Sequence, residues 1–416
     1  MKLTRYPETY NPILEYWDAI QSGRETVSLK VQKTYRHVVE QLEAENSEFY
    51  YSPKRANHVI EFFENYCHHS KGKAGGQLVK LELWEKALLA TIFGFIDIEG
   101  NRQYREAILI VGKKNGKSLL ASGVGLYLQL ADGEAGPEVY AVATKRDQAK
   151  IIWQEAKRMV QKSPALRKRT RCLVGEVDSD YNDGVFKPLS SDSDTLDGLN
   201  IHGAMMDEIH QWKNGRPLYD IIADGDQARA QPLRFITSTA GTIREDIYDE
   251  KYEEAERIIN GYEDPDGYHD LFAFIYELDK RSEWTDPDCW KKANPGLGTI
   301  KSYTALKERV ERAEKNPDLV RNLVCKDFNI RETSSEAWLN FEQLDNRDTF
   351  QLDRENRRLI WQHQMADGKT QERVLSYPRY GIGGADLSKT TDLTAAKVLF
   401  PVPELPEDIP SEADLY

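Results

Sequence analysis

Residues 105–118 read Arg-Glu-Ala-Ile-Leu-Ile-Val-Gly-Lys-Lys-Asn-Gly-Lys-Ser, and a helical pattern begins directly after the turn. The apolar run predicts a short strand. In a strand–loop–helix unit, the loop N–H groups and the helix N-terminus can surround phosphate oxygens. Lys117 would reach the β- and γ-phosphates, and the Ser118 hydroxyl would ligate Mg²⁺. The residues that we expect around the phosphates are Gly112, Lys113, Lys114, Asn115, Gly116, Lys117 and Ser118.

The spacing of this loop departs from the common G-x-x-x-x-G-K-[ST] pattern. Val111 stands where the first glycine is expected, and Gly112 comes one position later. Taken alone, the loop could equally be a solvated turn, because short Gly/Lys strings arise by chance. Its interpretation therefore depends on the strands that follow.

A second apolar strand ends in paired carboxylates. Residues 203–208 read Gly-Ala-Met-Met-Asp-Glu. In a parallel sheet the C-terminal ends of the strands lie together, at the edge where ligands bind. Asp207 would support Mg²⁺, and Glu208 would orient and deprotonate the attacking water. The alternative is a strand that ends in a solvated Asp-Glu pair.

A third strand is predicted within residues 232–242, which read Pro-Leu-Arg-Phe-Ile-Thr-Ser-Thr-Ala-Gly-Thr. The hydroxyl of Thr239 could sense the γ-phosphate and transmit its loss, although an ordinary strand-to-loop turn has a similar composition. Residues 137–144 predict another strand, which leads into a helical pattern over 145–162. Alternating strands and helices favour an α/β fold with a mostly parallel sheet.

In this order, the motifs resemble the large terminase subunit of tailed bacteriophages, most closely the cohesive-end type. The resemblance covers the chain from about residue 59 to residue 400. Each motif is common, but the ordered set is specific. Besides the segments above, it includes Ala143-Thr144-Lys145-Arg146-Asp147-Gln148-Ala149, Ser190-Ser191-Asp192, Leu196-Asp197-Gly198-Leu199-Asn200, Asp207-Glu208-Ile209-His210, Trp290, Ala293-Asn294-Pro295-Gly296-Leu297-Gly298, Gly381-Ile382-Gly383-Gly384-Ala385-Asp386-Leu387-Ser388 and Asp392-Leu393-Thr394-Ala395.

The resemblance implies an ATP-driven motor that moves double-stranded viral DNA into a procapsid. In that family, a P-loop ATPase domain of the ASCE type is joined to a ribonuclease H-like nuclease, which cuts the DNA concatemer with two metal ions (Mg²⁺ or Mn²⁺). Family members form a ring on the portal protein and work with a small terminase subunit. The resemblance also implies a location in the bacterial host cytoplasm.

Two departures from the family pattern affect the nucleotide site. The family usually has a Trp-Gln pair that contacts adenine, whereas this chain has Trp84-Glu85. A carboxylate at Glu85 could accept a hydrogen bond from the adenine amino group but could not donate one to N7. Related motors have an arginine finger in the loop that here reads Leu196-Asp197-Gly198. The remaining candidates for this role are Arg216, Arg229, Arg234 and Arg244, or Lys113 and Lys114 acting in cis.

The C-terminal residues resemble the start of the nuclease. Residues 380–386 predict a strand that ends in Asp386, and residues 392–399 predict its hairpin partner. Asp386 would be one ligand of the nuclease metals, while the family supplies the others from later strands. Two-metal hydrolysis needs several carboxylates around metals about 4 Å apart. We therefore expect a chain that ends at Tyr416 to hold an incomplete nuclease and not to cut DNA.

The 416 residues carry a formal net charge of −13. No apolar run approaches the ~18 residues of a membrane span, and four scattered cysteines fit free thiols in a reducing compartment. The net charge does not exclude DNA, because DNA contact needs only a local basic stripe. The best candidate lies within residues 162–171 and contains Arg167, Lys168, Arg169 and Arg171, although a solvated loop would explain the same run.

The expected organisation is a helical N-terminal region (1–75), a P-loop core (76–242), a lid subdomain with a strand within 268–278 (243–330), a helix-prone linker (331–378) and the first nuclease hairpin (379–416). Glu208, Lys117 and Thr239 would carry the ATPase chemistry. Two other classes of protein remain. A superfamily 2 helicase shares the Asp-Glu-Ile-His signature but should have a second RecA-like domain. A catalytically silent factor that binds DNA or portal would explain Val111.

Overall fold

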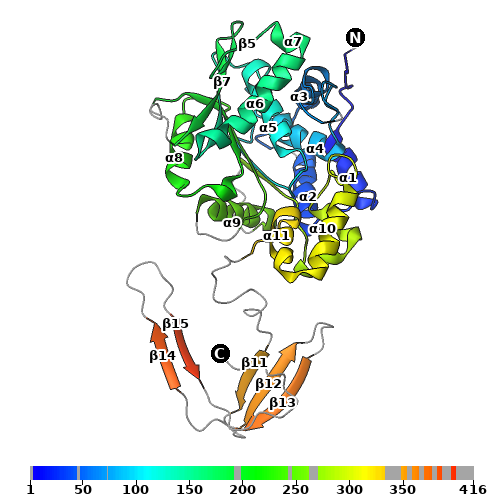
Figure 1. Ribbon diagram of the computed structural model, residues 1–416, viewed down its shortest axis with the longest axis vertical. Helices are drawn as coiled ribbons and strands as arrows, with labels where there is room; N and C mark the ends of the chain where they lie inside the picture. The colour runs from blue at the N-terminus through cyan, green and yellow to red at the C-terminus, as the bar shows by residue number, and fades with distance from the viewer. Residues whose placement is uncertain are drawn as a thin grey trace. The chain divides into compact units, whose positions relative to one another are not determined.

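The structure is a computed structural model of the chain (Figure 1). It describes residues 3–44, 47–72, 74–191, 198–241, 246–261, 270–332, 348–353, 358–364, 370–376, 382–386 and 395–399. The chain divides into two compact units, residues 1–335 and 336–416. Among the described residues, no helix has both the length and the apolar character that a membrane crossing requires.

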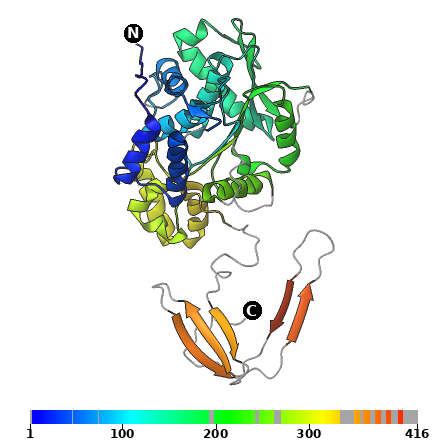
Figure 2. The same cartoon turned by 180° about the vertical axis from the view of Figure 1, so that it is seen from behind.

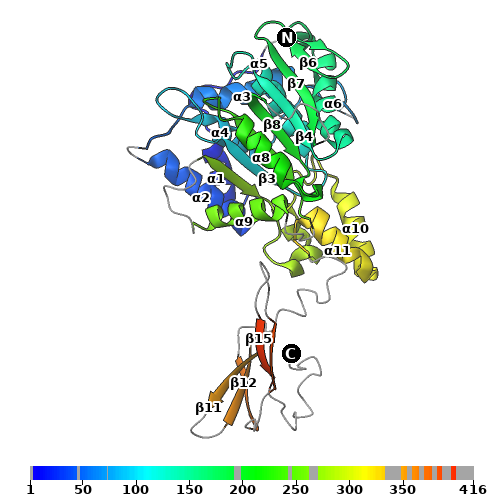
Figure 3. The same ribbon diagram turned by 90° about the vertical axis from the view of Figure 1, so that its left-hand side faces the viewer.

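An eight-stranded sheet forms the centre of the first unit (Figure 3). In spatial order its strands are β10 (Leu271–Ile275), β3 (Glu106–Ile110), β9 (Leu233–Ser238), β8 (Ile201–Asp207), β4 (Glu138–Ala143), β7 (Gly184–Ser190), β6 (Val177–Ser179) and β5 (Arg171–Cys172). The strands from β10 to β7 pair in parallel, whereas β6 and β5 pair antiparallel at one edge. The predicted mostly parallel α/β sheet is confirmed, and the C-terminal ends of β3, β9 and β8 lie at the same edge.

Helices cover both faces of the sheet, because successive strand residues point to opposite sides. On one face, Ala107 and Leu109 share a core with α5 (Lys117–Leu130) and α6 (Arg146–Lys162). On the other face, Ile108 and Ile110 share a core with α8 (Arg216–Gly225) and α9 (Ile247–Asn260). A short helix, α7 (Pro164–Arg167), follows α6, and a 3-10 turn, η1 (Ile209–Gln211), follows β8.

The N-terminal region is helical, as expected, and belongs to the same core as α5. It contains α1 (Pro12–Gln21), α2 (Leu29–Glu43), α3 (Pro53–Tyr66) and α4 (Leu83–Gly94), with a small antiparallel pair formed by β1 (Tyr50–Tyr51) and β2 (Phe95–Ile96). Asn11, Ser28 and Ser52 cap the first three helices, because each side chain accepts from an N–H group of the first turn. Helix α2 packs against β10 (Leu271–Ile275) and α9, and Figure 2 shows the blue N-terminal helices from behind.

A third, smaller core lies between β10 and the end of the first unit. Two 3-10 segments, η2 (Arg281–Thr285) and η3 (Pro287–Lys292), precede the helices α10 (Tyr303–Lys315) and α11 (Pro317–Phe328) in the chain. Trp290 of η3 and Phe328 of α11 are two large side chains of this core. The strand expected within residues 268–278 exists as β10. Its assignment to a lid was wrong, because its five buried apolar residues pair with β3 and extend the central sheet.

In the second unit, all the residues that the structure describes lie in strands. β11 (Asp348–Asp353), β12 (Arg358–Gln364) and β13 (Thr370–Ser376) form an antiparallel sheet. The expected helical character of residues 331–378 is therefore wrong for the described residues 348–353, 358–364 and 370–376, which pair as strands. The expected hairpin is confirmed by β14 (Ile382–Asp386) and β15 (Ala395–Leu399), in which Asp386 pairs with Ala395.

Candidate active site

The loop between β3 and α5 is fixed by a left-handed glycine and a buried asparagine. Gly116, at the N-cap of α5, has a φ of +86°, which glycine adopts without steric penalty. Asn115 is fully buried, and its Nδ2 donates to Gly112 O at 2.8 Å. The N-terminus of α5 therefore opens at the C-terminal edge of the sheet, where the N–H groups of its first turn can bind phosphate.

The first half of the loop is bonded to a distant part of the chain. Gly112 N donates to Ala293 O at 3.0 Å, and Lys113 N donates to Lys326 O at 2.9 Å. These N–H groups are thus engaged elsewhere, which corrects the expectation that they surround phosphate. The turn from Lys114 to Ser118 is the part of the loop that can do so.

A buried polar cluster supports the loop, and sequence reasoning missed its role. Asn115 Nδ2 also donates to Asn294 Oδ1 at 2.9 Å, and Lys301 Nζ donates to the same oxygen at 2.6 Å. Asp327 Oδ1 accepts from Lys301 at 2.9 Å. Gly112 must be glycine here, because a Cβ on it would lie 2.5 Å from Asn294 Oδ1. The signal in the sequence was the Asn-Pro-Gly run at 294–296, whose meeting with residue 115 depends on tertiary packing.

Val111 continues strand β3 and does not begin the turn. Its N–H donates to Ser238 O on β9 at 3.1 Å, and its side chain is buried. A position that still belongs to the sheet has no need for glycine. The unusual spacing therefore reflects a loop that starts at Gly112, and it gives no structural support to a degenerate loop.

Lys117, the first residue of α5, extends back over the loop. Its Nζ donates to Val111 O at 3.1 Å and lies 3.7 Å from Glu208 Oε1. Burial lowers the pKa of its ammonium group, an effect that the Glu208 and Asp207 carboxylates oppose. The ammonium thus stands between the loop and the two carboxylates, where phosphate oxygens would enter.

Asp207 ends strand β8 and faces the first turn of α5. Its Oδ2 accepts from Ser118 Oγ at 3.2 Å, and its Oδ1 accepts from Thr237 Oγ1 at 2.7 Å. Burial and the neighbouring Glu208 raise the pKa of Asp207 above its usual range. A hydroxyl and a carboxylate are hard oxygen ligands of the kind that Mg²⁺ prefers, and a cation there would offset the cost of the buried charge. The pair therefore fits Mg²⁺.

Glu208 has a strained backbone and a partly exposed side chain. Its φ of +51° and ψ of +44° are uncommon for a residue other than glycine. Its Oε2 lies 3.1 Å from His210 Nδ1 and 3.5 Å from Thr239 Oγ1. The side chain is 24% exposed, so a water molecule can reach the carboxylate. Such strain is typical of residues held in place for chemistry.

The segment after β9 joins the site to α11. β9 lies between β3 and β8, which places the buried Thr239 beside Glu208. The next residue, Ala240, donates its N–H to Asn329 Oδ1 at 2.9 Å and accepts from Lys326 Nζ at 3.1 Å. The end of α11 therefore contacts both the phosphate loop and the Thr239 segment.

Trp84 and Glu85 lie in the first turn of helix α4, and Glu85 borders the phosphate loop. A Cβ on Gly116 would lie 3.7 Å from Glu85 Oε1, while Glu85 Oε2 accepts from Glu82 N at 2.9 Å. Burial raises the pKa of Glu85 to about 8. A raised pKa favours the protonated carboxyl, which can donate as well as accept a hydrogen bond.

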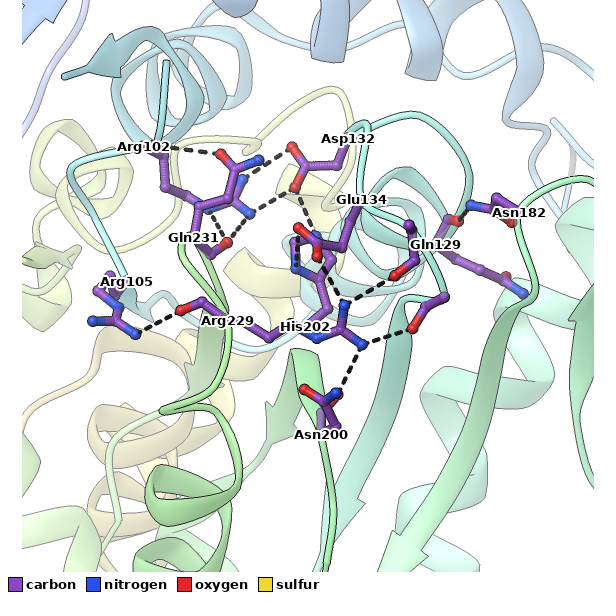
Figure 4. Close-up of polar contacts among 12 residues, drawn as sticks. Arg102, Arg105, Gln129, Asp132, Glu134, Asn182, Asn200, His202, Arg229 and Gln231 are labelled. Atoms are coloured by element: carbon purple, nitrogen blue, oxygen red, sulfur yellow. Dashed lines mark hydrogen bonds and ion pairs between the residues drawn. The ribbon is translucent and has the colours of Figure 1, made fainter. Parts of the chain in front are cut away.

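The arginine-finger candidates lie in different parts of the first unit. Arg229 contacts Glu134 at 2.8 Å among the polar residues of Figure 4, and Arg234 pairs with Glu106 at the start of β3 at 2.7 Å. Both guanidinium groups are largely buried and paired with carboxylates at the opposite edge of the sheet. Arg216 is about half exposed and pairs with Glu250 at 2.5 Å. Arg244, like Leu196 and Asp197, lies outside the described residues, and Lys113 and Lys114 are exposed.

The basic segment lies on the surface around α7. Arg167, Lys168 and Arg169 are exposed, and within the described part of the chain none of them forms an ion pair. Arg171 differs, because it contacts Asp178 and Asp180, both at 2.6 Å. Its charge is neutralised within the protein, so Arg171 is the weakest member of the expected group.

The fold and the arrangement of Lys117, Ser118, Asp207 and Glu208 define a P-loop NTPase fold. Residues 83–257 match the family model for the ATPase domain of the terminase large subunit, and residues 266–405 match the model for its endonuclease domain. The chain belongs to the terminase large subunit family.

Relatives and a solved structure agree with this assignment. The terminase large subunit of Enterobacteria phage HK97 is 25% identical over 351 residues, which cover 82% of this chain and 61% of that protein. The terminase large subunit of Lactococcus phage p2 is 22% identical over 314 residues, 72% of this chain and 55% of the relative. The crystal structure of the HK97 large terminase has the same fold, with a TM-score of 0.58 and 22% identity over 77% of this chain and 67% of that one. The chain thus spans about three fifths of the length of the HK97 protein.

Proposed function

We propose that this protein is the ATP-hydrolysing motor of viral DNA packaging, which moves double-stranded DNA into a procapsid. The observation that carries the proposal is the convergence of Lys117, Ser118, Asp207 and Glu208 at one edge of the sheet, from the start of α5 and the end of β8. The family assignment supplies the biological setting. A helicase is less well supported, because both matched segments of the chain correspond to terminase domains.

Each of the four residues has a distinct role in the proposed ATPase. Lys117 neutralises the β- and γ-phosphate oxygens, and the N–H groups from Lys114 to Ser118 hold them. Ser118 and Asp207 would hold Mg²⁺, which neutralises charge on the phosphates when bound. Glu208, strained and accessible to water, orients the attacking water and accepts its proton.

Thr239 couples hydrolysis to movement in this proposal. Its hydroxyl is 3.5 Å from Glu208, and the next residue is bonded to Asn329 and Lys326 at the end of α11. A displacement of Thr239 on loss of the γ-phosphate would therefore reach α11. The moving lid would then consist of α9, α10 and α11, whereas β10 belongs to the central sheet.

Trp84 and Glu85 would contact adenine. A protonated Glu85 offers one donor and one acceptor, the same pair that a glutamine amide offers. Base selectivity would then resemble that of a glutamine at this position.

DNA would contact the exposed cations around α7. Arg167, Lys168 and Arg169 are free of carboxylate partners among the described residues, and the adjacent β5–β6 turn exposes Leu173 and Val174, the latter by 97%. A ring of subunits would gather one such modest patch from each copy. Changing the three cations to Ala should flatten the dependence of log DNA affinity on log salt, because fewer counterions are released. An unchanged slope would place the DNA contact elsewhere.

The second unit would hold the start of the nuclease. Asp386, at the end of β14, would ligate one of the Mg²⁺ or Mn²⁺ ions that cut the concatemer. The remaining partners proposed from the family are the portal protein, the small terminase subunit and other copies of this chain in a ring, in the cytoplasm of the bacterial host.

The proposal is tested by the Mg²⁺-dependent ATPase activity of the purified chain. Lys117→Ala should abolish turnover and weaken ATP binding, whereas Glu208→Gln should abolish turnover and retain ATP binding. Lys54→Ala and Glu43→Gln are matched controls, because both side chains are exposed, on α3 and α2, outside the proposed site and lid. Absence of ATP hydrolysis by the wild-type chain, with ATP binding intact, would favour a silent assembly factor.

A further inference from the structure

His210 lies in a closed position behind Glu208. Its side chain is 3% exposed, and its Nδ1 is 3.1 Å from Glu208 Oε2 and 3.0 Å from Ser238 Oγ. The three residues come from different elements: Glu208 follows β8, His210 lies in η1, and Ser238 ends β9. One imidazole nitrogen therefore connects the proposed catalytic base with the strand that leads to Thr239.

The neighbours of Nδ1 determine which ring nitrogen carries the proton. Ser238 Oγ donates its hydrogen to Thr239 O at 2.9 Å, so it can only accept from the imidazole. Glu208 Oε2, as an ionised carboxylate, also only accepts. Both neighbours of Nδ1 are acceptors, and Nδ1 must therefore be the protonated nitrogen. Its N–H faces Ser238 Oγ at 3.0 Å, and the Glu208 carboxylate lies beside it at 3.1 Å.

Gly241 and Tyr248 pack against His210 and restrict its side chain. A Cβ on Gly241 would lie 2.8 Å from His210 Cβ, so a larger residue at position 241 would displace the histidine. On the other side, the ring of Tyr248 on α9 meets the imidazole edge-on, with ring centroids 6.2 Å apart. The orientation of His210 is thus fixed by packing as well as by hydrogen bonds.

We propose that His210 is a positioning residue that holds the Glu208 carboxylate toward the attacking water and makes this orientation depend on the Ser238–Thr239 segment. The inference rests on the proposed function, since it assigns a supporting residue to the same ATPase site. Lys117, the other charged neighbour of Glu208, would be drawn toward phosphate when ATP enters. His210 would then keep the carboxylate in place together with the Thr239 hydroxyl, which lies 3.5 Å from Glu208 Oε2.

The test compares His210→Ala with His210→Asn. Alanine removes the donor, and a base misplaced by about 1 Å can lose on the order of 10²-fold in rate. We expect His210→Ala to lower kcat by about this factor, with KM and ATP affinity close to wild type. Asn places its Nδ2 near the position of Nδ1 and should recover most of kcat. A kcat within a few-fold of wild type for His210→Ala, or equal losses in both variants, would overturn the inference.

Gly241→Ala and Glu208→Gln complete the experiment. Gly241→Ala leaves every hydrogen-bonding group in place but presses on the imidazole, so it should also lower kcat without raising KM. A rise in KM at unchanged kcat would count against positioning. Glu208→Gln distinguishes failure of the proposed function from failure of the role of His210. If Glu208→Gln hydrolyses ATP normally, the proposed function is wrong. If Glu208→Gln is inactive and His210→Ala is active, only the role assigned to His210 is wrong. Thermal unfolding of each variant shows whether the fold is retained.

Discussion

A buried carboxylate lies near each end of strand β8, and the two carboxylates have different kinds of hydrogen-bonding partner. At its N-terminal end, His202 Nε2 contacts Asp132 Oδ2 at 2.8 Å, and Arg102 binds the same carboxylate with two nitrogens at 3.1 and 2.6 Å (Figure 4). At its C-terminal end, Asp207 accepts, among the described residues, from hydroxyl and backbone groups only, and Glu208 is strained.

The pKa shifts show what this difference means. Burial alone would raise the pKa of Asp132, but Arg102 and His202 hold it well below its usual range. Burial and Glu208 instead raise the pKa of Asp207. A carboxylate that the protein satisfies contributes to stability, whereas one whose pKa stays raised despite the nearby Lys117 ammonium is ready for a metal ion or substrate. The same strand therefore separates a stabilising end from a reactive end.

The largest effect is expected at the stabilising end. Asp132→Asn would leave Arg102 buried without its counter-ion, and removal of one partner from a buried pair typically costs about 3–5 kcal/mol. Urea unfolding should show this loss in the free energy of unfolding. Asp147→Asn, at a fully exposed carboxylate, is the control and should change little. A loss no larger than that of the control would mean that the cluster does not stabilise the fold.

The stability that Asp132 contributes should depend on pH. Because the pKa of Asp132 is lower in the folded than in the unfolded chain, its contribution is complete above the unfolded value of ~3.9 and is lost as pH falls toward the folded value. The difference in unfolding free energy between wild type and Asp132→Asn should therefore shrink when urea unfolding is repeated below about pH 4. A difference that stays constant with pH would contradict the assigned cause.

A smaller effect is expected from the cluster that supports the phosphate loop. Asn294→Ala removes an acceptor from Asn115 and Lys301, and unsatisfied buried groups cost about 1–3 kcal/mol each. Because this cluster lies at the reactive end, we expect ATP affinity to fall together with stability. Isothermal titration with ATP, beside urea unfolding, measures both. Lost stability with unchanged ATP affinity would mean that the cluster does not support nucleotide binding by the loop.

The smallest effect is expected at Glu85. Its pKa of about 8 means that its donor is lost as pH rises through that value. Wild-type ATP affinity should decline between pH 7 and pH 9, whereas Glu85→Gln, which keeps a donor at all pH values, should decline less. Parallel declines in the two proteins would remove Glu85 from the adenine site.

The sequence was informative where function depends on neighbours in the chain. Lys117 and Ser118 could be identified because they begin a helix one loop after a visible apolar run, and Asp207 and Glu208 because they stand at the end of another. Their grouping at one edge follows from parallel pairing.

Contacts between distant segments could not be foreseen. Asn294 meets Asn115 across 179 positions, and the approach of His210 to Ser238 depends on the order of the strands. The strand at 271–275 was visible, but its pairing with β3 was not. In the second unit, charge content favoured helix over 348–376, although strand pairing decides the outcome there.

The separation of the two ends of β8 is tested most directly by measuring Mg²⁺-dependent ATP turnover per folded molecule for wild type, Glu208→Gln and Asp132→Asn side by side. Loss of a positioned base costs about 10²–10⁴-fold, so Glu208→Gln should be nearly inactive yet as stable as wild type. Asp132→Asn should be less stable yet turn over ATP at the wild-type rate while folded. Normal turnover by Glu208→Gln, or an inactive but folded Asp132→Asn, would contradict the account.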